Sequence, residues 1–173
     1  MKKYTRKTIE FYNKYSKDYI KSGAFVLKNK IDKFARLINH GGRILDVGCG
    51  PGHDTDYFTK KGFDCLGIDL SKKMIKHAKK NLKGKFQIMD FLNLKLKKNS
   101  FDGIWCSATL IHVAKDDLNK ILKSFFKILK KRGILGIIIR RVTKRVPKKE
   151  DTRIFTMFYK KEFEDYLIKN KFK

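Results

Sequence analysis

A buried strand that runs into a glycine-rich turn is the feature that most constrains the fold of this chain. Residues 44–52 read ILDVGCGPG, and a helical pattern follows them directly. Glycines allow the backbone to approach a ligand closely, and the N-terminus of the next helix offers N–H groups without helical partners. A dinucleotide-binding fingerprint would need a glycine at position 53, which is histidine, and no Gly-Lys-Ser/Thr follows as in a P-loop. The turn therefore predicts a ligand site of another type.

The rest of the chain alternates between apolar runs and amphipathic helical patterns. Unbroken apolar strands separated by helices are typical of a parallel sheet that is covered on both faces. We therefore predict a single α/β domain over residues 1–173, with an N-terminal helical cap over residues 1–40 and a core over residues 41–173. The pattern predicts helices over 5–20, 25–38, 53–62, 71–84 and 115–133, and strands over 43–49, 63–70, 85–90, 101–111 and 134–142.

The glycine turn resembles motif I of the class I, Rossmann-like S-adenosylmethionine-dependent methyltransferases, in which an aspartate precedes alternate glycines. Asp46, Gly48, Gly50 and Gly52 match this motif, and the order of the following elements agrees over roughly residues 10–172. The resemblance implies a doubly wound, mostly parallel sheet of five main strands with helices on both faces. It also implies S-adenosylmethionine as the cofactor.

The resemblance further implies which residues bind the cofactor. Asp69 ends the second strand, where a carboxylate can accept both ribose hydroxyls, and Leu70 would cover one face of the adenine. Asp90 ends the third strand and would accept the adenine amino group, with Phe91 packed on the ring; a capping role at the strand end is the alternative for Asp90. The predicted cofactor-binding residues are Asp46, Gly48, Cys49, Gly50, Gly52, Asp69, Leu70, Asp90, Phe91 and Ser107.

The acceptor side of the site follows from the chemistry of methyl transfer. Transfer from a sulfonium mainly requires alignment and exclusion of water, so a base is needed only for an acceptor that carries a proton. His112, near the end of the fourth strand, could be that base, and capping of the following loop is its alternative role. The tyrosines of the first helix resemble the lid of many relatives, although core packing explains them equally well. The predicted acceptor-pocket residues are Tyr12, Tyr19, Thr109, His112, Arg153 and Tyr159.

Other titratable residues near these motifs are predicted to be structural. Asp54 and Asp56 would stabilise the start of a helix through its dipole, and Asp102 would hold a turn. The three cysteines contain no CxxC pair, so neither a zinc site nor a disulfide framework is indicated, and we expect no metal.

The charge of the chain leaves the methyl acceptor open. The formal net charge is +26, which attracts anions such as nucleic acid, but a solvated lysine-rich surface is an equally good interpretation. We expect a small-molecule acceptor, because no recognition domain is appended. One alternative is an RNA methyltransferase, supported by the basic run at 140–149 but lacking the Asn/Asp-Pro-Pro-Tyr/Phe element of base-N enzymes. The other is a non-catalytic protein on the same fold that binds nucleic acid or a partner.

The two ends of the sequence add expectations about location and assembly. Residues 1–20 lack the apolar stretch of a signal peptide, and the longest apolar run, 134–139, is too short to span a bilayer, so we expect a cytoplasmic protein without membrane contact. Family members usually continue past a helix like 162–169 into two further strands, so strands six and seven are expected to be missing here. We expect residues 153–159 to fold back as a short edge strand beside the fifth strand, in a monomer or weak dimer.

Overall fold

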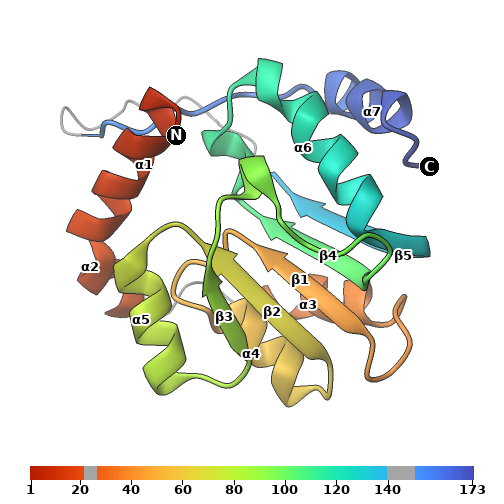
Figure 1. Cartoon of the computed structure of the whole chain (residues 1–173), viewed down its shortest axis with the longest axis horizontal. Coiled ribbons are helices and arrows are strands. Elements are labelled where there is room, and N and C mark those ends of the chain that lie inside the picture. Colours follow the sequence, from red (N-terminus) through yellow and green to blue (C-terminus); the bar gives the residue numbers. More distant parts are fainter. Residues whose placement is uncertain (22–26, 140–150) are drawn as a thin grey trace.

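The computed structural model describes residues 1–21, 27–139 and 151–173, and a parallel sheet forms its centre (Figure 1). The strands lie in the order β3-β2-β1-β4-β5, and neighbours run in the same direction. β4 lies beside β1, on the side away from β2, so strand order reverses between β1 and β4, which is where open α/β sheets bind ligands. This confirms the predicted Rossmann-like sheet of five strands. The bounds are Arg43–Val47 for β1, Asp64–Asp69 for β2, Lys85–Ile88 for β3, Phe101–Ser107 for β4 and Leu129–Ile138 for β5.

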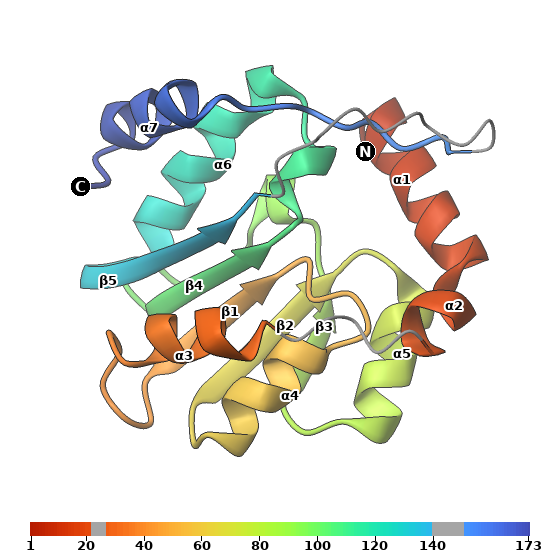
Figure 2. The same cartoon turned by 180° about the vertical axis from the view of Figure 1, so that it is seen from behind.

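Helices cover both faces of this sheet. Successive side chains of a strand point to opposite faces, so Ile44 packs with α3 and α4, whereas Leu45 and Val47 pack with α6 and α7. Helices α3 and α4 lie in front of the sheet in Figure 2, and α5 packs on β2 and β3. The bounds are Lys3–Lys14 for α1, Ser16–Lys21 for α2, Lys28–Ala35 for α3, His53–Lys60 for α4, Lys72–Asn81 for α5, Lys115–Ile128 for α6 and Lys160–Lys169 for α7.

The N-terminal helix predicted over residues 5–20 is divided into α1 and α2. The division lies at Tyr15, between the two helices. The side chain of Ser16 donates a hydrogen bond to the backbone carbonyl of Asn13 at 3.0 Å. A serine bonded in this way competes with the regular helical pattern and bends the chain.

The boundary between α6 and β5 differs from the prediction, which continued the helix to residue 133. The helix ends at Ile128, and the strand begins at Leu129. Asn99 and Ser100 donate their backbone N–H groups to the last two carbonyls of α6, which ends the helical ladder. Because Ile128 and Leu129 are both buried, the apolar pattern continues across this boundary and does not mark it.

The prediction that residues 153–159 form an edge strand beside β5 is wrong. These residues have no strand conformation. The backbone N–H of Thr156 instead donates to the carbonyl of Ile111 at 2.7 Å, and its hydroxyl donates to Val113. This segment therefore follows the loop after β4, and β5 is an edge of the sheet in the described part of the chain. No described helix is both long and apolar enough to cross a membrane.

Candidate active site

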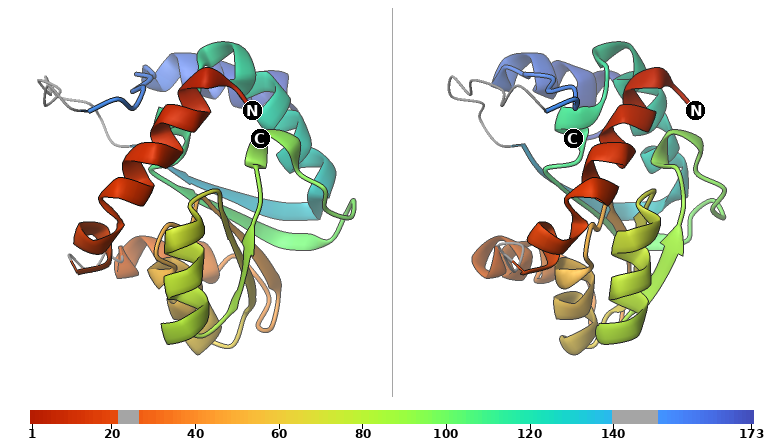
Figure 3. Two further views of the ribbon diagram at one scale, coloured as in Figure 1. Left: turned by 60° about the vertical axis from the view of Figure 1, so that its left-hand side comes forward. Right: turned by 90° about the vertical axis from the view of Figure 1, so that its left-hand side faces the viewer.

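A cavity of about 450 Å³ opens at the carboxyl ends of the central strands, a volume typical of small-molecule sites. Helix α1 runs across this end of the sheet between α6 and α5 (Figure 3). It is attached at both ends. Lys2 and Tyr4 bond Asp117 in α6, and Ser71, the N-cap of α5, donates to the side chain of Asn13 at 2.7 Å. Helix α1 therefore covers the cavity and is held there from both sides.

Most of the predicted site residues line this one cavity. They come from distant parts of the chain and meet because the carboxyl ends of parallel strands share one edge of the sheet. Of the predicted cofactor residues, the cavity is lined by Asp46, Gly48, Cys49, Gly50, Asp69, Leu70, Phe91 and Ser107. Of the predicted acceptor residues, it is lined by Tyr12, Tyr19, Thr109, His112 and Arg153.

Three predicted residues lie outside that lining. Tyr159 is 75% exposed and caps α7 together with Glu162, so its placement in the acceptor pocket is wrong. The carboxylate of Asp90 accepts the backbone N–H of Leu92 at 2.9 Å and caps the short helix Phe91–Asn93. Its contact with adenine stays a prediction.

Gly52, the third of these residues, lies on the side of the turn that packs against Phe86 and not on the side that lines the cavity. Its φ of 93° is left-handed, and a Cβ there would lie 2.6 Å from the ring of Phe86. Gly50 has a φ of 52°, but nothing lies within 4 Å of the position its Cβ would take. The two glycines therefore have different structural roles. Gly50 keeps the cavity side of the turn open, and Gly52 lets α4 pack closely against β3 and α5.

The carboxylate of Asp69 joins the two turns that bound the cavity. One oxygen accepts the backbone N–H of Gly50 at 3.0 Å, and the other accepts that of Ser71 at 2.7 Å. Burial raises the pKa of Asp69 above its usual range, and the hydrogen bonds from the backbone oppose this shift. Each carboxylate oxygen can accept more than one hydrogen bond, so both remain able to bind ligand hydroxyls.

Two further carboxylates face the same cavity. Asp46 is 2% exposed and accepts the hydroxyl of Thr55 at 2.6 Å. Asp54 accepts the indole N–H of Trp105 at 2.8 Å. Burial raises the pKa of Asp46 well above its usual range, and the charge of Asp54 raises it further. The sequence indicated only a favourable interaction of Asp54 with the helix dipole, so its place in the cavity was missed.

A chain of hydrogen bonds connects the lid helix with the end of β4. The Nδ1 of His112 lies 2.8 Å from the carbonyl of Ile154, which can only accept, so Nδ1 carries a hydrogen. In the neutral ring, Nε2 then accepts the hydroxyl of Tyr12 at 2.9 Å. Arg153 donates to the oxygen of Tyr12 at 3.1 Å and to that of Tyr19 at 3.0 Å. Burial raises the pKa of Tyr12 to about 12, so this hydroxyl is protonated at neutral pH.

Arg153 is fixed by a buried ion pair. Its guanidinium contacts the carboxylate of Asp151 at 2.6 Å, and both side chains are about 5% exposed or less. The Cζ atom of Arg153 lies 4.0 Å from the centroid of the Phe11 ring and 4.9 Å from that of the Phe155 ring. Burial opposes the charge of Arg153, but the bond to Asp151 and the tyrosines raise its pKa above the usual range. The guanidinium therefore stays charged and in one position.

Unpaired polar atoms also point to a ligand in this cavity. In the described residues, three buried side-chain atoms lack a hydrogen-bond partner: Thr5 Oγ1, His53 Nε2 and Asn170 Oδ1. Thr5 and His53 both line the cavity. Buried polar groups are usually hydrogen-bonded, so two such atoms at one cavity favour a polar ligand there. Neither residue carries a motif that the sequence analysis could have detected.

Comparison with known proteins identifies the family. A family model described as "Methyltransferase domain" matches residues 45–137, from Leu45 in β1 through the glycine turn to Ile137 in β5. The chain belongs to the S-adenosylmethionine-dependent methyltransferase family. A SAM-dependent methyltransferase from Methanosarcina mazei has the same fold, with a TM-score of 0.68 and 20% identity over 80% of this chain and 82% of that one.

Two curated relatives act on different kinds of acceptor. The phosphoethanolamine N-methyltransferase of Plasmodium falciparum is 29% identical over 78% of this chain and 52% of its own length. The ribosomal RNA small subunit methyltransferase A of Mycoplasmopsis synoviae is 26% identical over 75% of this chain and 51% of its own length. The chain spans only about a quarter to a half of the curated relatives that it matches first.

Replacing each glycine of the turn by alanine should separate cofactor binding from folding. Both positions have positive φ, so both variants share a cost of about 1–2 kcal/mol for the left-handed conformation. Gly50→Ala adds a methyl group to the cavity and should weaken S-adenosylmethionine binding about tenfold or more. Gly52→Ala should lose a further 1–3 kcal/mol or so of stability, because its methyl group meets Phe86. Calorimetry and urea unfolding measure the two effects, and equal behaviour of the two variants would refute the distinction.

Asp54→Asn should make the protein more stable at neutral pH in the absence of cofactor. Burial raises the pKa of Asp54, so the folded protein holds its proton more tightly than the unfolded chain does. Above the unfolded pKa of about 3.9, the ionised group therefore lowers the free energy of unfolding. Asparagine keeps an oxygen for the Trp105 indole. The urea midpoint of the variant should be higher at pH 7, and the difference should vanish near pH 3.

Asp56→Asn is the matched control for this prediction. Asp56 pairs with Lys60 at 2.5 Å and accepts the backbone N–H of Lys83, so its replacement removes favourable contacts. It should give no gain in stability at pH 7. If Asp54→Asn does not raise the urea midpoint at pH 7, burial of the ionised Asp54 does not lower the stability. If Asp56→Asn raises the midpoint equally, the gain is not specific to Asp54.

Proposed function

We propose that this protein transfers the methyl group of S-adenosylmethionine to a small molecule whose accepting atom carries a proton. The observation that carries the proposal is the hydrogen-bonded pair of Tyr12 and His112 inside a cavity covered by α1. The pair supplies a route for the departing proton, and the covering helix limits the size of the acceptor.

The residues of the cavity fit the proposed cofactor. When bound, S-adenosylmethionine supplies a methyl group on a positively charged sulfur. Asp69 would accept its ribose hydroxyls, while Leu70 and Phe91 offer apolar surface for the adenine. Asp46 and Asp54 place two carboxylates beside the turn and would favour a cationic ligand over a neutral one.

The covering of the cavity supports a small acceptor. Helix α1 contacts both α5 and α6, and the segment around Arg153 closes the cavity from the other side through its bonds to Tyr12 and Tyr19. A base in RNA would have to be flipped out of its strand and pass this covering. The relative that methylates phosphoethanolamine agrees with a small acceptor that loses a proton from nitrogen.

The hydrogen bonds define how the proton would leave. An acceptor N–H or O–H that approaches Tyr12 can donate to its oxygen while the tyrosine hydroxyl gives its own proton to Nε2 of His112. Both N–H groups of the resulting imidazolium would have a hydrogen-bond acceptor, because Nδ1 already donates to the Ile154 carbonyl and Nε2 would then donate to the Tyr12 oxygen. Arg153 holds the tyrosine oxygen and stabilises negative charge that develops on it.

A second candidate function is methylation of RNA. The net charge of +26 and the relative that modifies ribosomal RNA favour it. The basic run at 140–149 that the sequence analysis singled out lies outside the described residues. We further propose a cytoplasmic location, which agrees with three free cysteines in the described structure, and a monomer or weak dimer.

Asp69→Ala tests cofactor binding and, with it, the non-catalytic alternative. The wild-type chain should bind S-adenosylmethionine and its demethylated product in calorimetry. Loss of the charge-assisted bonds to two hydroxyls should weaken binding by about 2–4 kcal/mol. Asp90→Ala is the comparison for the adenine contact. Absence of binding by the folded wild-type chain would establish the non-catalytic alternative, and an unchanged affinity of Asp69→Ala would reject the ribose assignment.

Tyr12→Phe tests the proton route. A tritiated-methyl assay on a metabolite extract and on total RNA first identifies the acceptor class, and label in RNA alone would contradict a small acceptor. With that acceptor, Tyr12→Phe and His112→Gln should each lower kcat about 100-fold or more, with little change in cofactor affinity. The loss should shrink as pH rises, because the acceptor then loses its proton to water. Tyr19→Phe removes another hydroxyl bonded to Arg153 and should cost much less.

A further inference from the structure

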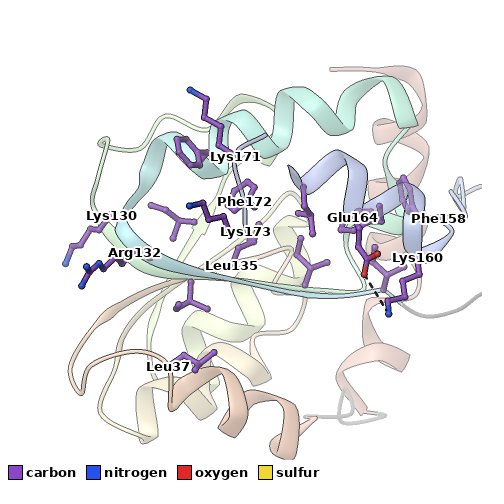
Figure 4. Close-up of a pocket in the computed structure, with 18 of the residues that line it drawn as sticks. Leu37, Lys130, Arg132, Leu135, Phe158, Lys160, Glu164, Lys171, Phe172 and Lys173 are labelled. Atoms are coloured by element: carbon purple, nitrogen blue, oxygen red, sulfur yellow. Dashed lines mark ion pairs between the residues drawn. The ribbon is translucent and has the colours of Figure 1, made fainter. Parts of the chain in front are cut away.

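A second cavity shares no lining residue with the methyl-transfer site. It is a groove of about 1630 Å³ between β5, α7 and the last residues of the described chain (Figure 4). Large apolar side chains that are strongly exposed gather around it: Leu37 at 65%, Phe126 at 44%, Met157 at 51% and Tyr159 at 75%. Grouped exposed apolar residues of this kind mark an interaction surface.

The floor of the groove is an open strand edge. The backbone carbonyl of Ile138 accepts the N–H of Ala108, which follows β4, so Ile138 faces β4. Backbone groups alternate along a strand in a parallel pair, so Leu135 and Ile137 direct their N–H and C=O groups away from β4. Both residues line the groove, and no described strand pairs with this edge. A second extended segment can therefore bond there directly.

Positive charge surrounds one end of the groove. Lys131, Arg132, Lys171 and Lys173 all line it and are exposed, and none forms an ion pair with a described residue. Figure 4 shows Lys130 and Arg132 on the first residues of β5, with the C-terminal Lys171 and Lys173 above the strand. The one acid among the lining residues, Glu164, lies 3.8 Å from Lys160 near the other end. An occupant with carboxylates facing the start of β5 would match this charge.

We propose that the groove binds an extended segment of an acidic partner protein, which adds to the sheet as a strand beside β5. Backbone bonds to Leu135 and Ile137 would hold the segment, alternate apolar side chains would fill the groove, and acidic side chains would reach Lys131 and Lys173. Nucleic acid would satisfy the lysines but leave the apolar floor exposed. A second copy of this chain would bring like charges together at the same edge.

The test uses the full chain and a synthetic peptide of eight alternating valine and glutamate residues. Amide hydrogen exchange measured by NMR should be fast at Leu135 and Ile137 in the free protein. It should slow there about tenfold or more when the peptide saturates the groove, because both N–H groups become bonded. Ile134, Gly136 and Ile138, whose N–H groups face β4, should exchange slowly throughout. Peptide binding without slower exchange at Leu135 and Ile137 would overturn strand addition.

Matched peptides and variants test the charge. A valine–lysine peptide of equal length, and a valine–glutamate peptide with alternate amides N-methylated, should bind at least about tenfold more weakly. Lys131→Glu combined with Lys173→Glu should lower the affinity for the valine–glutamate peptide by a similar factor. Lys79→Glu combined with Lys80→Glu makes the same change of net charge on exposed positions of α5 and should leave affinity unchanged. Equal binding of the lysine peptide, or equal effects of the two double variants, would overturn an acidic partner.

The free protein supplies the last control. Slow exchange at Leu135 and Ile137 in a sample that light scattering shows to be monomeric would mean that another part of this chain covers the edge. Slow exchange that appears only with dimer formation would mean that a second copy covers it. Either result would overturn the proposal, and fast exchange in the monomer supports it. The methyl-transfer site enters none of these measurements, so the proposal and the proposed function can fail separately.

Discussion

The carboxylate of Asp69 is the contact on which the geometry of the cavity depends. It reaches from the end of β2 to the glycine turn after β1 and also holds the start of α5, so three elements are positioned by one side chain. The turn is also bound to β2 by two backbone bonds to the carbonyl of Ile68. A buried carboxylate is stable only when hydrogen bonds replace its hydration, and two backbone N–H groups provide them here. The same group that orders the turn is thus also available to a ligand.

The sequence predicted the central strands β1, β2 and β4 well because they are mostly apolar runs, a local pattern that can be recognised without knowledge of distant contacts. β1 to β4 lie within the predicted segments, and most residues predicted around the glycine turn line one cavity. Asp54 was assigned to the helix dipole because acids in a first helical turn usually have that role. Its bond to Trp105 depends on the neighbouring strand β4, and no local pattern reveals it.

The error at Tyr159 has a local cause, because capping of α7 turns this residue away from the cavity. Tyr159 follows a segment that does reach the cavity, but its backbone caps α7: its carbonyl accepts the N–H of Phe163, and its N–H donates to Glu162. Arg153 was assigned to the acceptor pocket from family resemblance alone. Its bond to Tyr12 joins residues that lie at opposite ends of the chain, and it exists only because α1 crosses the sheet. Contacts of this kind follow from the assembled fold and not from spacing along the sequence.

The attachment of α1 at both ends has a consequence for the rate of turnover. Cofactor and acceptor would share the cavity under α1, and the spent cofactor must leave it after every cycle. A release path past the helix would break its contacts with Asp117 or Ser71, or the bond between the Arg153 segment and Tyr12. Motions of this kind take microseconds to milliseconds and limit many enzymes. The rate of turnover would then depend on how often α1 moves away from the cavity. Higher solvent viscosity would lower this rate more than a change of methyl acceptor would.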